Sequence, residues 1–253
     1  MKSYKLTFCF LIIVTTSNIH GQSRFNLEFS SSYLVTSRVI TRYESELYKD
    51  FRNSNEKFLP GFDVSSTLNY KINDSFSFLT GVGYSKNGYM IKANPLIDPG
   101  NISTTPRFIS QIFRFKYENI YIPLHISYQT NKKLNYSVNF GPSILFPISE
   151  NLEWVLRTGM EEGGAFEKTT STHIYPESKK MNMTLDLGIG IGYKISNNLN
   201  LIIQPKISYY LFNYENITSK DMYYNISLLD GENRSTKEHF YDFGVTLRLI
   251  INP

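Results

Sequence analysis

The sequence predicts an all-β fold, an eight-stranded antiparallel up-and-down barrel that crosses a membrane, and three observations lead to it. First, every odd position from Met181 to Ile195 is apolar and every even position is polar or glycine. Only a strand produces a period of two, and this run exceeds the roughly 9–11 residues that a tilted strand needs to cross a bilayer. Second, the pattern recurs along the chain. Third, short and long connections alternate between the runs.

The alternation occurs in eight segments, each with large apolar side chains at every second position. We expect strands at about 24–35, 60–72, 75–90, 112–129, 134–148, 181–195, 199–212 and 239–250. In the same order, representative apolar positions are Leu27, Val64, Phe78, Ile122, Val138, Ile189, Ile203 and Val245. β-Branched and aromatic residues at this spacing favour strands.

The connections between these segments differ in length. Tight turns are expected at 73–74, 131–133 and 196–198, which are rich in Asn, Asp and Ser. Long connections are expected at about 36–59, 91–110, 149–180 and 213–238. Short connections at one end and long ones at the other are typical of outer-membrane barrels, whose short turns face the periplasm. An even number of strands then puts both termini in the periplasm and four long loops outside the cell.

The fourth segment changes phase. Phe113, Phe115 and Tyr117 are apolar at odd positions, whereas the run from Ile120 is apolar at even positions. A β-bulge near Glu118-Asn119 would restore the register. Alternatively, the residues before Glu118 project beyond the membrane and are free of the lipid constraint.

Side-chain volume predicts which face of the barrel points outward. A soluble barrel of the lipocalin type also has eight alternating strands, with its apolar residues inside. Here the apolar positions hold Phe, Tyr, Leu and Ile, and the opposite positions include Gly81, Gly188, Gly190 and Gly192. The interior of an eight-stranded barrel is only just wide enough for its side chains, so the small and polar set is expected inside. Charged residues are absent from the apolar phase except for Lys86 near the end of the third segment and the stretch before Glu118.

The first 21 residues are expected to be a secretory signal peptide, and residues 22–253 the barrel domain. Lys2 and Lys5 precede an apolar stretch from Leu6 to Val14, which is too short to span a membrane as a helix.

The composition of the mature chain excludes several classes of site. Cys9 is the only cysteine, so no disulfide and no cysteine metal site are expected after cleavage. Without Lys2 and Lys5, 24 basic residues face 22 acidic ones, and this slight charge gives no reason to expect a nucleic-acid partner.

An ordered set of short motifs occurs at residues 118–128 (ENIYIPLHISY), 139–143 (NFGPS), 188–193 (GIGIGY) and 206–213 (KISYYLFN). In this order they resemble the YxEIPLLxKY strand, the Gly-Pro signature, the glycine-rich strand and the RYxxxLxN strand of the PorT-like outer-membrane β-barrel family. The sequence departs from that pattern at Asn119, His125 and Lys206. The resemblance covers about Gln22 to the end and implies a small outer-membrane barrel. One founding member assists protein secretion, a role that fold alone does not transfer.

The last segment is similar to the sequence that the barrel-assembly machinery recognises. Asp242, Gly244, Leu247 and Leu249 supply its polar, glycine and apolar positions. The chain ends in Pro253 rather than in an aromatic residue, so the match is partial. The expected partners are this machinery, outer-membrane lipid and lipopolysaccharide.

Several inward positions of the predicted strands are charged. They are Glu28, Asp63, Lys71, Asp186, Lys194, Lys206, Asp242 and Arg248. One interpretation is a charged lumen that selects ions. We favour a network of ion pairs and hydrogen bonds that fills the barrel, because buried charges need partners and eight strands leave no open channel.

A membrane-embedded hydrolase would need a nucleophile, a base and an orienting group that converge. His125 and Ser127 share the inward face of one segment, where both would be enclosed, and His173 and His239 lie in or beside long loops near Ser171. Four histidines among many hydroxyl groups produce such pairs by chance, so we expect no enzyme. No metal-ligand spacing, phosphate loop or nucleotide fingerprint occurs in the sequence, and no cofactor is expected.

The sequence therefore favours a non-enzymatic integral protein of a bacterial outer membrane with a structural or partner-docking role. The longest loop, from Glu150 to Lys180, either docks a protein partner or contacts only solvent and lipopolysaccharide. A narrow pore for ions or small solutes is the second possible function, and an outer-membrane hydrolase is the third.

Overall fold

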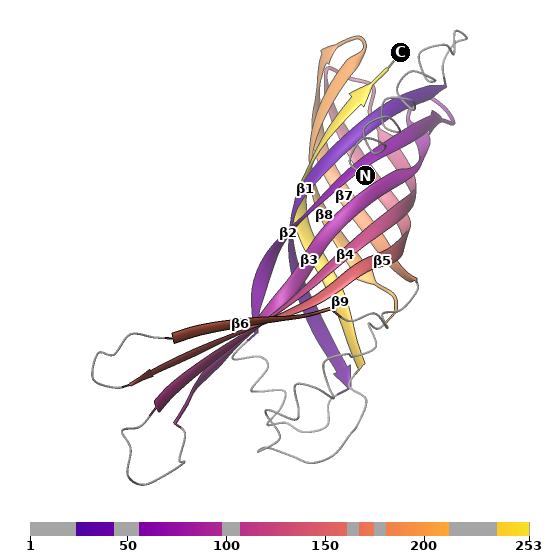
Figure 1. Ribbon diagram of the computed structural model, residues 1–253. Coiled ribbons are helices and arrows are strands. Elements are labelled where there is room, and N and C mark those ends of the chain that lie inside the picture. The colour runs from indigo at the N-terminus through magenta and orange to yellow at the C-terminus, as the bar shows by residue number, and fades with distance from the viewer. Residues whose placement is uncertain are drawn as a thin grey trace, which may run out of the picture.

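All elements of the described structure are β-strands (Figure 1). The described residues contain no helix that is long and apolar enough to cross a membrane. The computed structural model describes residues 24–42, 56–97, 107–160, 167–174, 181–212 and 237–252. The strands are β1 (Phe25–Arg42), β2 (Glu56–Lys71), β3 (Phe76–Ile97), β4 (Arg107–Gln129), β5 (Leu134–Met160), β6 (Glu167–Ile174), β7 (Asn182–Ser196), β8 (Leu199–Tyr210) and β9 (Lys237–Ile251).

Eight of these nine strands close into one antiparallel barrel. Strands β1 to β5 pair in chain order, β5 pairs with β7, and β7 to β9 again pair in order. β9 then pairs with β1, from Ile251 beside Leu27 to Lys237 beside Arg42, and this ladder completes the ring. Among the described strands, β6 pairs with β5 alone. The predicted eight-stranded barrel is confirmed.

Three short turns join strands at one end of the barrel, here called the turn end. Asn73 Oδ1 accepts the backbone N–H groups of Ser75 (2.9 Å) and Phe76 (2.8 Å), which reverses the chain between β2 and β3. The first and last described residues also lie at this end. The carbonyl of Arg24 accepts from the N–H of Lys71, and the N–H of Asn252 donates to the carbonyl of Asn198. The long connections are at the opposite end, here called the loop end.

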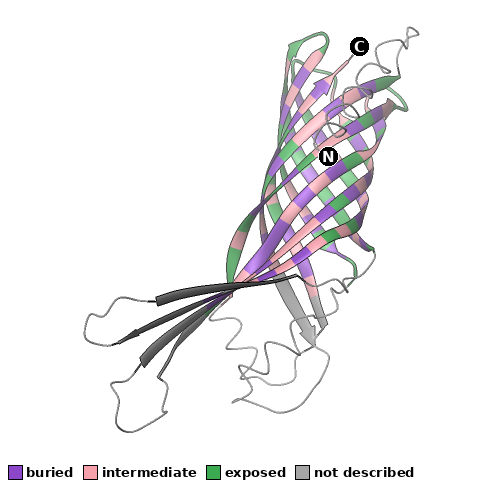
Figure 2. Ribbon diagram, viewed as in Figure 1, coloured by how far each residue is buried: buried purple, intermediate pink, exposed green. Residues whose placement is uncertain are grey.

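The alternation places large apolar side chains outside and small or polar ones inside (Figure 2). Along β7 every even position from Asn182 to Gly192 is buried. The odd positions between them are open, with Ile189 61% and Ile191 56% exposed. Such a lipid-facing band would be unfavourable in water and suits hydrocarbon. The direction predicted from side-chain volume is therefore confirmed.

Glycine occurs in the wall where neighbouring atoms leave no space for a side chain. Gly141 has a φ of +156°, and a Cβ at this position would lie 2.3 Å from the carbonyl oxygen of Leu124. A Cβ at Gly190 would lie 2.9 Å from the Cβ of Gln204, which points into the lumen. The lumen is thus as crowded as the volume argument assumed.

Aromatic side chains pair across strands near both rims of the lipid-facing band. The pairs are Phe25–Tyr70 and Phe76–Tyr128 at the turn end, each with ring centroids 5.1 Å apart, and Phe62–Tyr84 toward the loop end at 5.9 Å. Aromatic rings at these depths are typical of membrane interfaces.

The bulge predicted near Glu118 in the fourth segment lies in β5 rather than in β4. In the β4–β5 ladder Glu118 is opposite Ser149 and Asn119 is opposite Pro147, so Ile148 is the extra residue. The β3–β4 ladder continues through the same level without a shift.

Because β4 does not slip at this level, its odd positions face inward from Phe113 to Ser127. Phe113 and Phe115 are 3% and 4% exposed on this inner face, whereas Ile120 is 41% exposed on the outer face. The second alternative from the sequence is therefore the one observed. The residues before Glu118 pass beyond the lipid-facing band.

Strands β1 to β5 extend beyond their predicted loop-end limits, so residues 36–42 and 56–59 of the predicted loop at 36–59 are strand. The longest are β3, β4 and β5, which have 22, 23 and 27 residues, whereas a tilted strand crosses hydrocarbon with about 9–11. At the loop end, residues 86–97, 107–118, 149–160 and 167–174 form a sheet in the order β3-β4-β5-β6 that projects from the ring (Figure 1). We call this sheet the extension. Parts of the predicted loops at 91–110 and 149–180 are therefore strands.

Some predictions fall outside the described residues. These are the signal peptide at 1–21 and most of the loop at 213–238. The side chains of Trp154, Ser171 and His173 are also outside the described part of the structure, although their backbones lie in β5 and β6.

A charge at mid-height of the lipid-facing band should destabilise the barrel more than the same charge at the rim. For Ile189→Arg we expect the free energy of unfolding to fall by about 2–4 kcal/mol. The matched variant Ile148→Arg, at the loop-end rim, should lose only about 0–1 kcal/mol. Urea unfolding of the barrel in lipid vesicles measures both, and equal losses would contradict the assigned position of the band.

Candidate functional site

The turn-end half of the lumen contains a buried ion pair between the neighbouring strands β9 and β1. Arg248 of β9 donates from Nε to Glu28 Oε1 at 2.6 Å and from Nη2 to Oε2 at 2.7 Å. Its Nη1 donates to Gln204 Oε1 of β8 at 3.2 Å. Arg248 is 2% and Glu28 4% exposed. A bidentate contact between a guanidinium and a carboxylate is among the strongest that buried charges can make. Removal of one partner of a buried pair typically lowers the stability of a protein by about 3–5 kcal/mol.

A second ion pair lies nearer the middle of the barrel. The Lys206 ammonium of β8 is 3.4 Å from Asp63 Oδ2 of β2, on the other side of the lumen. It also lies 5.8 Å from the centre of the Tyr121 ring, within range of a cation–π contact. Asp63 Oδ1 accepts from Ser32 Oγ at 2.8 Å and from the Tyr121 hydroxyl at 3.5 Å. Four strands are thereby joined through one carboxylate.

The third carboxylate, Asp186 of β7, is held by groups from two neighbouring strands. Its Oδ2 accepts from Ser143 Oγ at 2.5 Å and lies 3.0 Å from His125 Nε2. His125 Nε2 is also 3.1 Å from Ser143 Oγ. The Ser143 hydroxyl is thus directed to the carboxylate rather than to a histidine base, and Ser143 is only 2% exposed. The three side chains thereby join β4, β5 and β7 inside the barrel.

The fourth carboxylate, Asp242 of β9, is satisfied by neutral donors. Thr36 Oγ1 donates to Oδ1 at 2.7 Å, and the Tyr210 hydroxyl and Asn87 Nδ2 approach Oδ2 at 2.8 and 3.0 Å. Hydroxyl and amide donors around a buried carboxylate remove most of the penalty of its burial.

Six of the eight charged residues predicted for the lumen make ion pairs or hydrogen bonds there, and the other two do not. Glu28 pairs with Arg248 and Asp63 with Lys206, whereas the nearest partners of Asp186 and Asp242 are uncharged or histidine side chains. Lys71 and Lys194 make no ion pair or hydrogen bond through their ammonium groups with any described residue. They lie at the turn end, below the filled part of the lumen, and therefore do not belong to the network.

Several participants were not among the predicted site residues. His125, Tyr121, Gln204 and Tyr210 all occupy inward positions of predicted strands, so the alternation gives their direction. Their partners depend on the register between strands, which sequence alone does not supply.

The four residues of the predicted assembly signal lie on both faces of β9. Leu247 (49% exposed) and Leu249 point outward, and Asp242 is buried in the lumen. A Cβ at Gly244 would lie 2.4 Å from the carbonyl oxygen of Tyr33 on β1. The small residue thus permits the close β1–β9 contact that closes the barrel.

Aromatic side chains fill the inside of the barrel above the polar network, toward the loop end. The Tyr89 ring stacks on Phe115 at 4.6 Å and lies 5.8 Å from Phe240, which meets Tyr210 edge-on at 6.1 Å. All four are at most 4% exposed. Because the Tyr210 hydroxyl also binds Asp242, this aromatic cluster rests directly on the polar network.

Two small cavities lie in the described part of the lumen. One of about 60 Å³ lies beside the Glu28–Arg248 and Asp63–Lys206 pairs, and one of about 20 Å³ lies between Asp186 and Tyr210. Such volumes hold a few water molecules. The described residues include no group of three His, Cys, Asp or Glu residues that could hold a metal ion.

Ion pairs also line the outer face of the extension. Lys86 Nζ lies 2.6 Å from Glu118, while Arg114 (2.8 Å) and Lys116 (2.5 Å) share Glu153. The hydrogen bond from Lys86 lowers the pKa of the Glu118 carboxyl, and that from Lys116 lowers the pKa of Glu153. These partly exposed pairs mark where the outer surface becomes polar.

Glu150, two residues beyond the bulge residue Ile148, differs from these partly exposed carboxylates. It is only 5% exposed, and this burial raises its pKa from 4.5 to about 7. A proton on Glu150 is therefore favoured by the folded extension.

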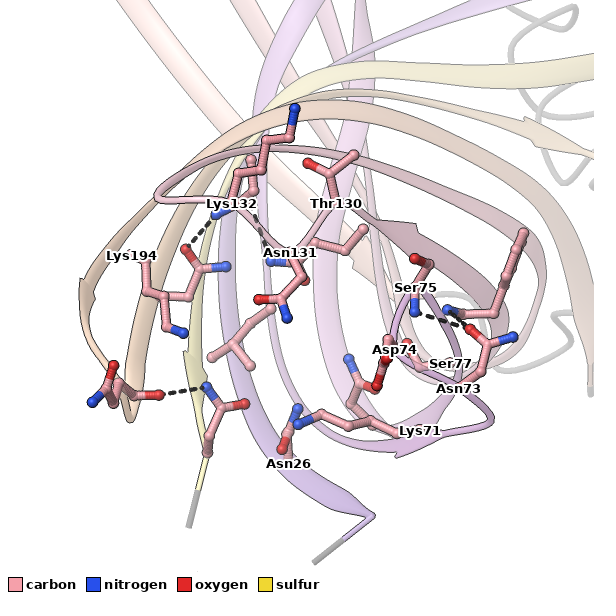
Figure 3. Close-up of a pocket in the computed structure, with 18 residues that line it drawn as sticks. Asn26, Lys71, Asn73, Asp74, Ser75, Ser77, Thr130, Asn131, Lys132 and Lys194 are labelled. Atoms are coloured by element: carbon pink, nitrogen blue, oxygen red, sulfur yellow. Dashed lines mark hydrogen bonds between the residues drawn. The ribbon is translucent and has the colours of Figure 1, made fainter.

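The turn end carries an open cavity of about 250 Å³, here called the bowl (Figure 3). Asn26 and Asn69 form one side, with Lys71 two residues farther along β2. Asn135 and Asn200 form the opposite side, with Lys194 next to Asn200 in the β7–β8 ladder. The bowl is almost entirely polar and is separate from the small cavities in the lumen.

The raised pKa of Glu150 predicts that the extension becomes less stable as the pH rises. The folded state binds more protons than the unfolded state between the pKa of 4.5 and about 7, so stability is lost across this interval. Hydrogen exchange at the β5 amides near Glu150, corrected for intrinsic rates, should therefore be faster at about pH 8 than at about pH 5.

Two variants test the origin of that pH dependence. Glu150→Gln should remove it. Glu153→Gln should keep it, because the pKa of Glu153 is lowered and its protonation falls below this interval. Persistence of the full pH dependence in Glu150→Gln would contradict the assignment.

The sequence matches a known protein family over residues 16–201, described as outer membrane protein beta-barrel domain. Similar solved structures include Neisserial surface protein A, at 14% identity over 90% of this chain and 98% of that chain, with a TM-score of 0.35. They also include Ail of Yersinia pestis (10% identity, 88% and 97% covered, TM-score 0.31) and OprG of Pseudomonas aeruginosa (8% identity, 90% and 96% covered, TM-score 0.39). No curated protein matches the chain. Since the family match spans well over half of the sequence, this chain belongs to the outer membrane protein β-barrel domain family and is an integral outer-membrane protein.

Proposed function

We propose that this protein is a sealed, non-enzymatic outer-membrane barrel whose extension docks a protein partner outside the cell. In this orientation the turn end and both termini face the periplasm of a Gram-negative cell, after cleavage of the signal peptide and insertion by the barrel-assembly machinery. Three tight turns at one end and long connections at the other support this orientation. The motifs from residue 118 onward support an assignment to the PorT-like group of these barrels, and with it an association with secretion or assembly.

The filling of the lumen favours a structural role over a pore. The buried Asp63–Lys206 pair reaches across the barrel, the buried Glu28–Arg248 pair joins neighbouring strands on the inner wall, and a layer of aromatic rings lies above both. A permeating ion would have to displace the bidentate Glu28–Arg248 contact, whose groups are at most 4% exposed. The two small cavities beside these pairs have room for only a few waters.

The described histidines favour a non-enzymatic role. His125 is enclosed beside Asp186 and Ser143. His239 Nδ1 lies 3.3 Å from the carbonyl oxygen of Tyr210, and its ring stacks on Tyr209 at 5.6 Å. Neither ring faces a serine hydroxyl that is open to solvent, as a hydrolase would need. The hydrolase therefore remains the third candidate, after the docking protein and the narrow pore.

The observation that carries the docking proposal is the length of the extension. β5 continues for 12 residues beyond Ile148, and β6 pairs with it from Ile174 beside Asn151 to Glu167 beside Thr158. Strands of this length are unnecessary for crossing hydrocarbon. An ordered sheet with paired charges on its outer face can present a fixed surface to a partner, which a polar loop does less well.

A sealed lumen predicts no steady ionic current. Planar bilayers that contain the purified barrel should give current traces like those of protein-free bilayers. A 16–18-stranded porin, which has an aqueous channel, serves as the positive control in the same membranes. Reproducible conductance steps from this protein would contradict the seal and favour the narrow pore.

The docking role predicts protein contacts at the extension and lipid contacts at the barrel wall. A photo-crosslinking amino acid at Lys92, which is exposed on β3 of the extension, should yield adducts with a defined protein in intact cells. The matched position Ile189, in the lipid-facing band, should yield lipid adducts. Absence of a protein adduct at Lys92, with surface display verified by antibody, would contradict the docking role.

A further inference from the structure

The bowl at the turn end contains buried acceptors without partners. Asn26 and Asn69 lie directly opposite each other in the β1–β2 ladder and are 5% and 4% exposed. The Oδ1 atom of each has no hydrogen-bond partner among the described residues. Both residues line the bowl. A buried carbonyl oxygen without a donor is unfavourable, so a ligand that supplies N–H or O–H groups would be stabilised here.

The other side of the bowl is already satisfied and rigid. Asn135 Nδ2 donates to Asn200 Oδ1 at 3.1 Å, and Gln129 Nε2 donates to Asn135 Oδ1 at 3.1 Å. Both asparagines are at most 5% exposed. The bowl therefore has one preformed side and one side whose acceptors need donors.

The charges around the bowl favour an anion. Lys71, Lys132 and Lys194 line it against one carboxylate, Asp74. Lys71 and Lys194 extend toward its interior from opposite sides (Figure 3). Neither ammonium group is bound to another described residue, so both are available to a ligand.

These features together narrow the chemistry of the ligand. It needs an anionic group for the lysines and adjoining N–H or O–H donors for Asn26 and Asn69. Inorganic phosphate offers the charge but few donors. A lipid would need an apolar wall for its chains, whereas Phe76 and Ile250 are the only large apolar residues that line the bowl. A peptide carboxylate next to its own amide N–H groups meets both requirements.

We propose that the bowl binds the free carboxylates of peptides carried by the cell-wall glycan. This inference rests on the proposed function, because only a periplasmic turn end would face that polymer. A cavity of about 250 Å³ accommodates the end of one peptide branch rather than a whole strand of the polymer. The barrel thereby contacts the cell wall through its turn end, while the extension remains free for a partner on the other side.

Binding of a soluble muropeptide tests the proposal directly. The probe is a disaccharide–tetrapeptide with free carboxylates, titrated into the full-length mature barrel in detergent by calorimetry. We expect saturable binding, and about tenfold weaker binding for the double variant Lys71→Gln/Lys194→Gln. The matched variant Lys133→Gln should bind within about twofold of the wild type, because Lys133 lies in the same turn as Lys132 but does not line the bowl. The same muropeptide with amidated carboxylates should also bind about tenfold more weakly.

Three outcomes would overturn the proposal. They are absence of saturable binding, equal binding by the double variant and the wild type, and competition by inorganic phosphate as effective as that by the muropeptide itself. A separate measurement tests the orientation. Asn131→Cys, in the turn beside the bowl, should resist a membrane-impermeant maleimide in intact cells. Labelling there would contradict the proposed orientation while leaving the calorimetric result on the bowl unchanged.

Discussion

A strand that lies in hydrocarbon has to pair both of its edges, because no water is present to bond free N–H and C=O groups. The β1–β9 ladder meets this requirement by joining the first and last strands of the sheet. The same ladder brings Arg248 diagonally beside Glu28 and turns both residues inward. Closure and charge pairing are therefore coupled. A slip of one residue in this ladder would turn Arg248 toward lipid and leave Glu28 buried without its partner.

The contents of the barrel follow from this closure. Eight strands enclose so little space that the inward positions are filled by glycine, by polar side chains that mostly meet a neighbour, and by buried apolar side chains. Polar contacts dominate from Arg248 to Asp242, and Tyr210 provides the transition to the aromatic cluster, since its hydroxyl binds Asp242 while its ring meets Phe240. The lumen is thus filled by polar contacts toward the turn end and by aromatic packing toward the loop end, and Tyr210 takes part in both. A wider barrel would need fewer such contacts and would admit water.

The sequence predicts the strands and the direction of each side chain, because both depend only on local alternation. It places His125 inside the barrel, for example. It does not predict that His125 meets Asp186, since that contact depends on the registers of β4 with β5 and of β5 with β7. It also misses β6, whose residues EKTTSTHI are polar at both phases and so lack the contrast between faces that lipid imposes. The sequence predicts the network as a set of inward charged residues. Only the structure shows that Lys71 and Lys194 do not belong to it.

The change of phase at Glu118 shows how the surroundings determine which face of a strand is apolar. On the turn-end side of Glu118, β4 directs apolar residues such as Ile120 outward, since hydrocarbon is the apolar phase there. On the other side it directs Phe113 and Phe115 inward, where they pack in the aromatic cluster, and its outer face carries Arg114 and Lys116. This inversion occurs within one continuous strand that keeps its register with β3. The hydrophobic effect is thus satisfied by lipid in one half of β4 and by protein in the other, and the aromatic cluster joins the base of the extension to Tyr210 and Phe240 of the barrel.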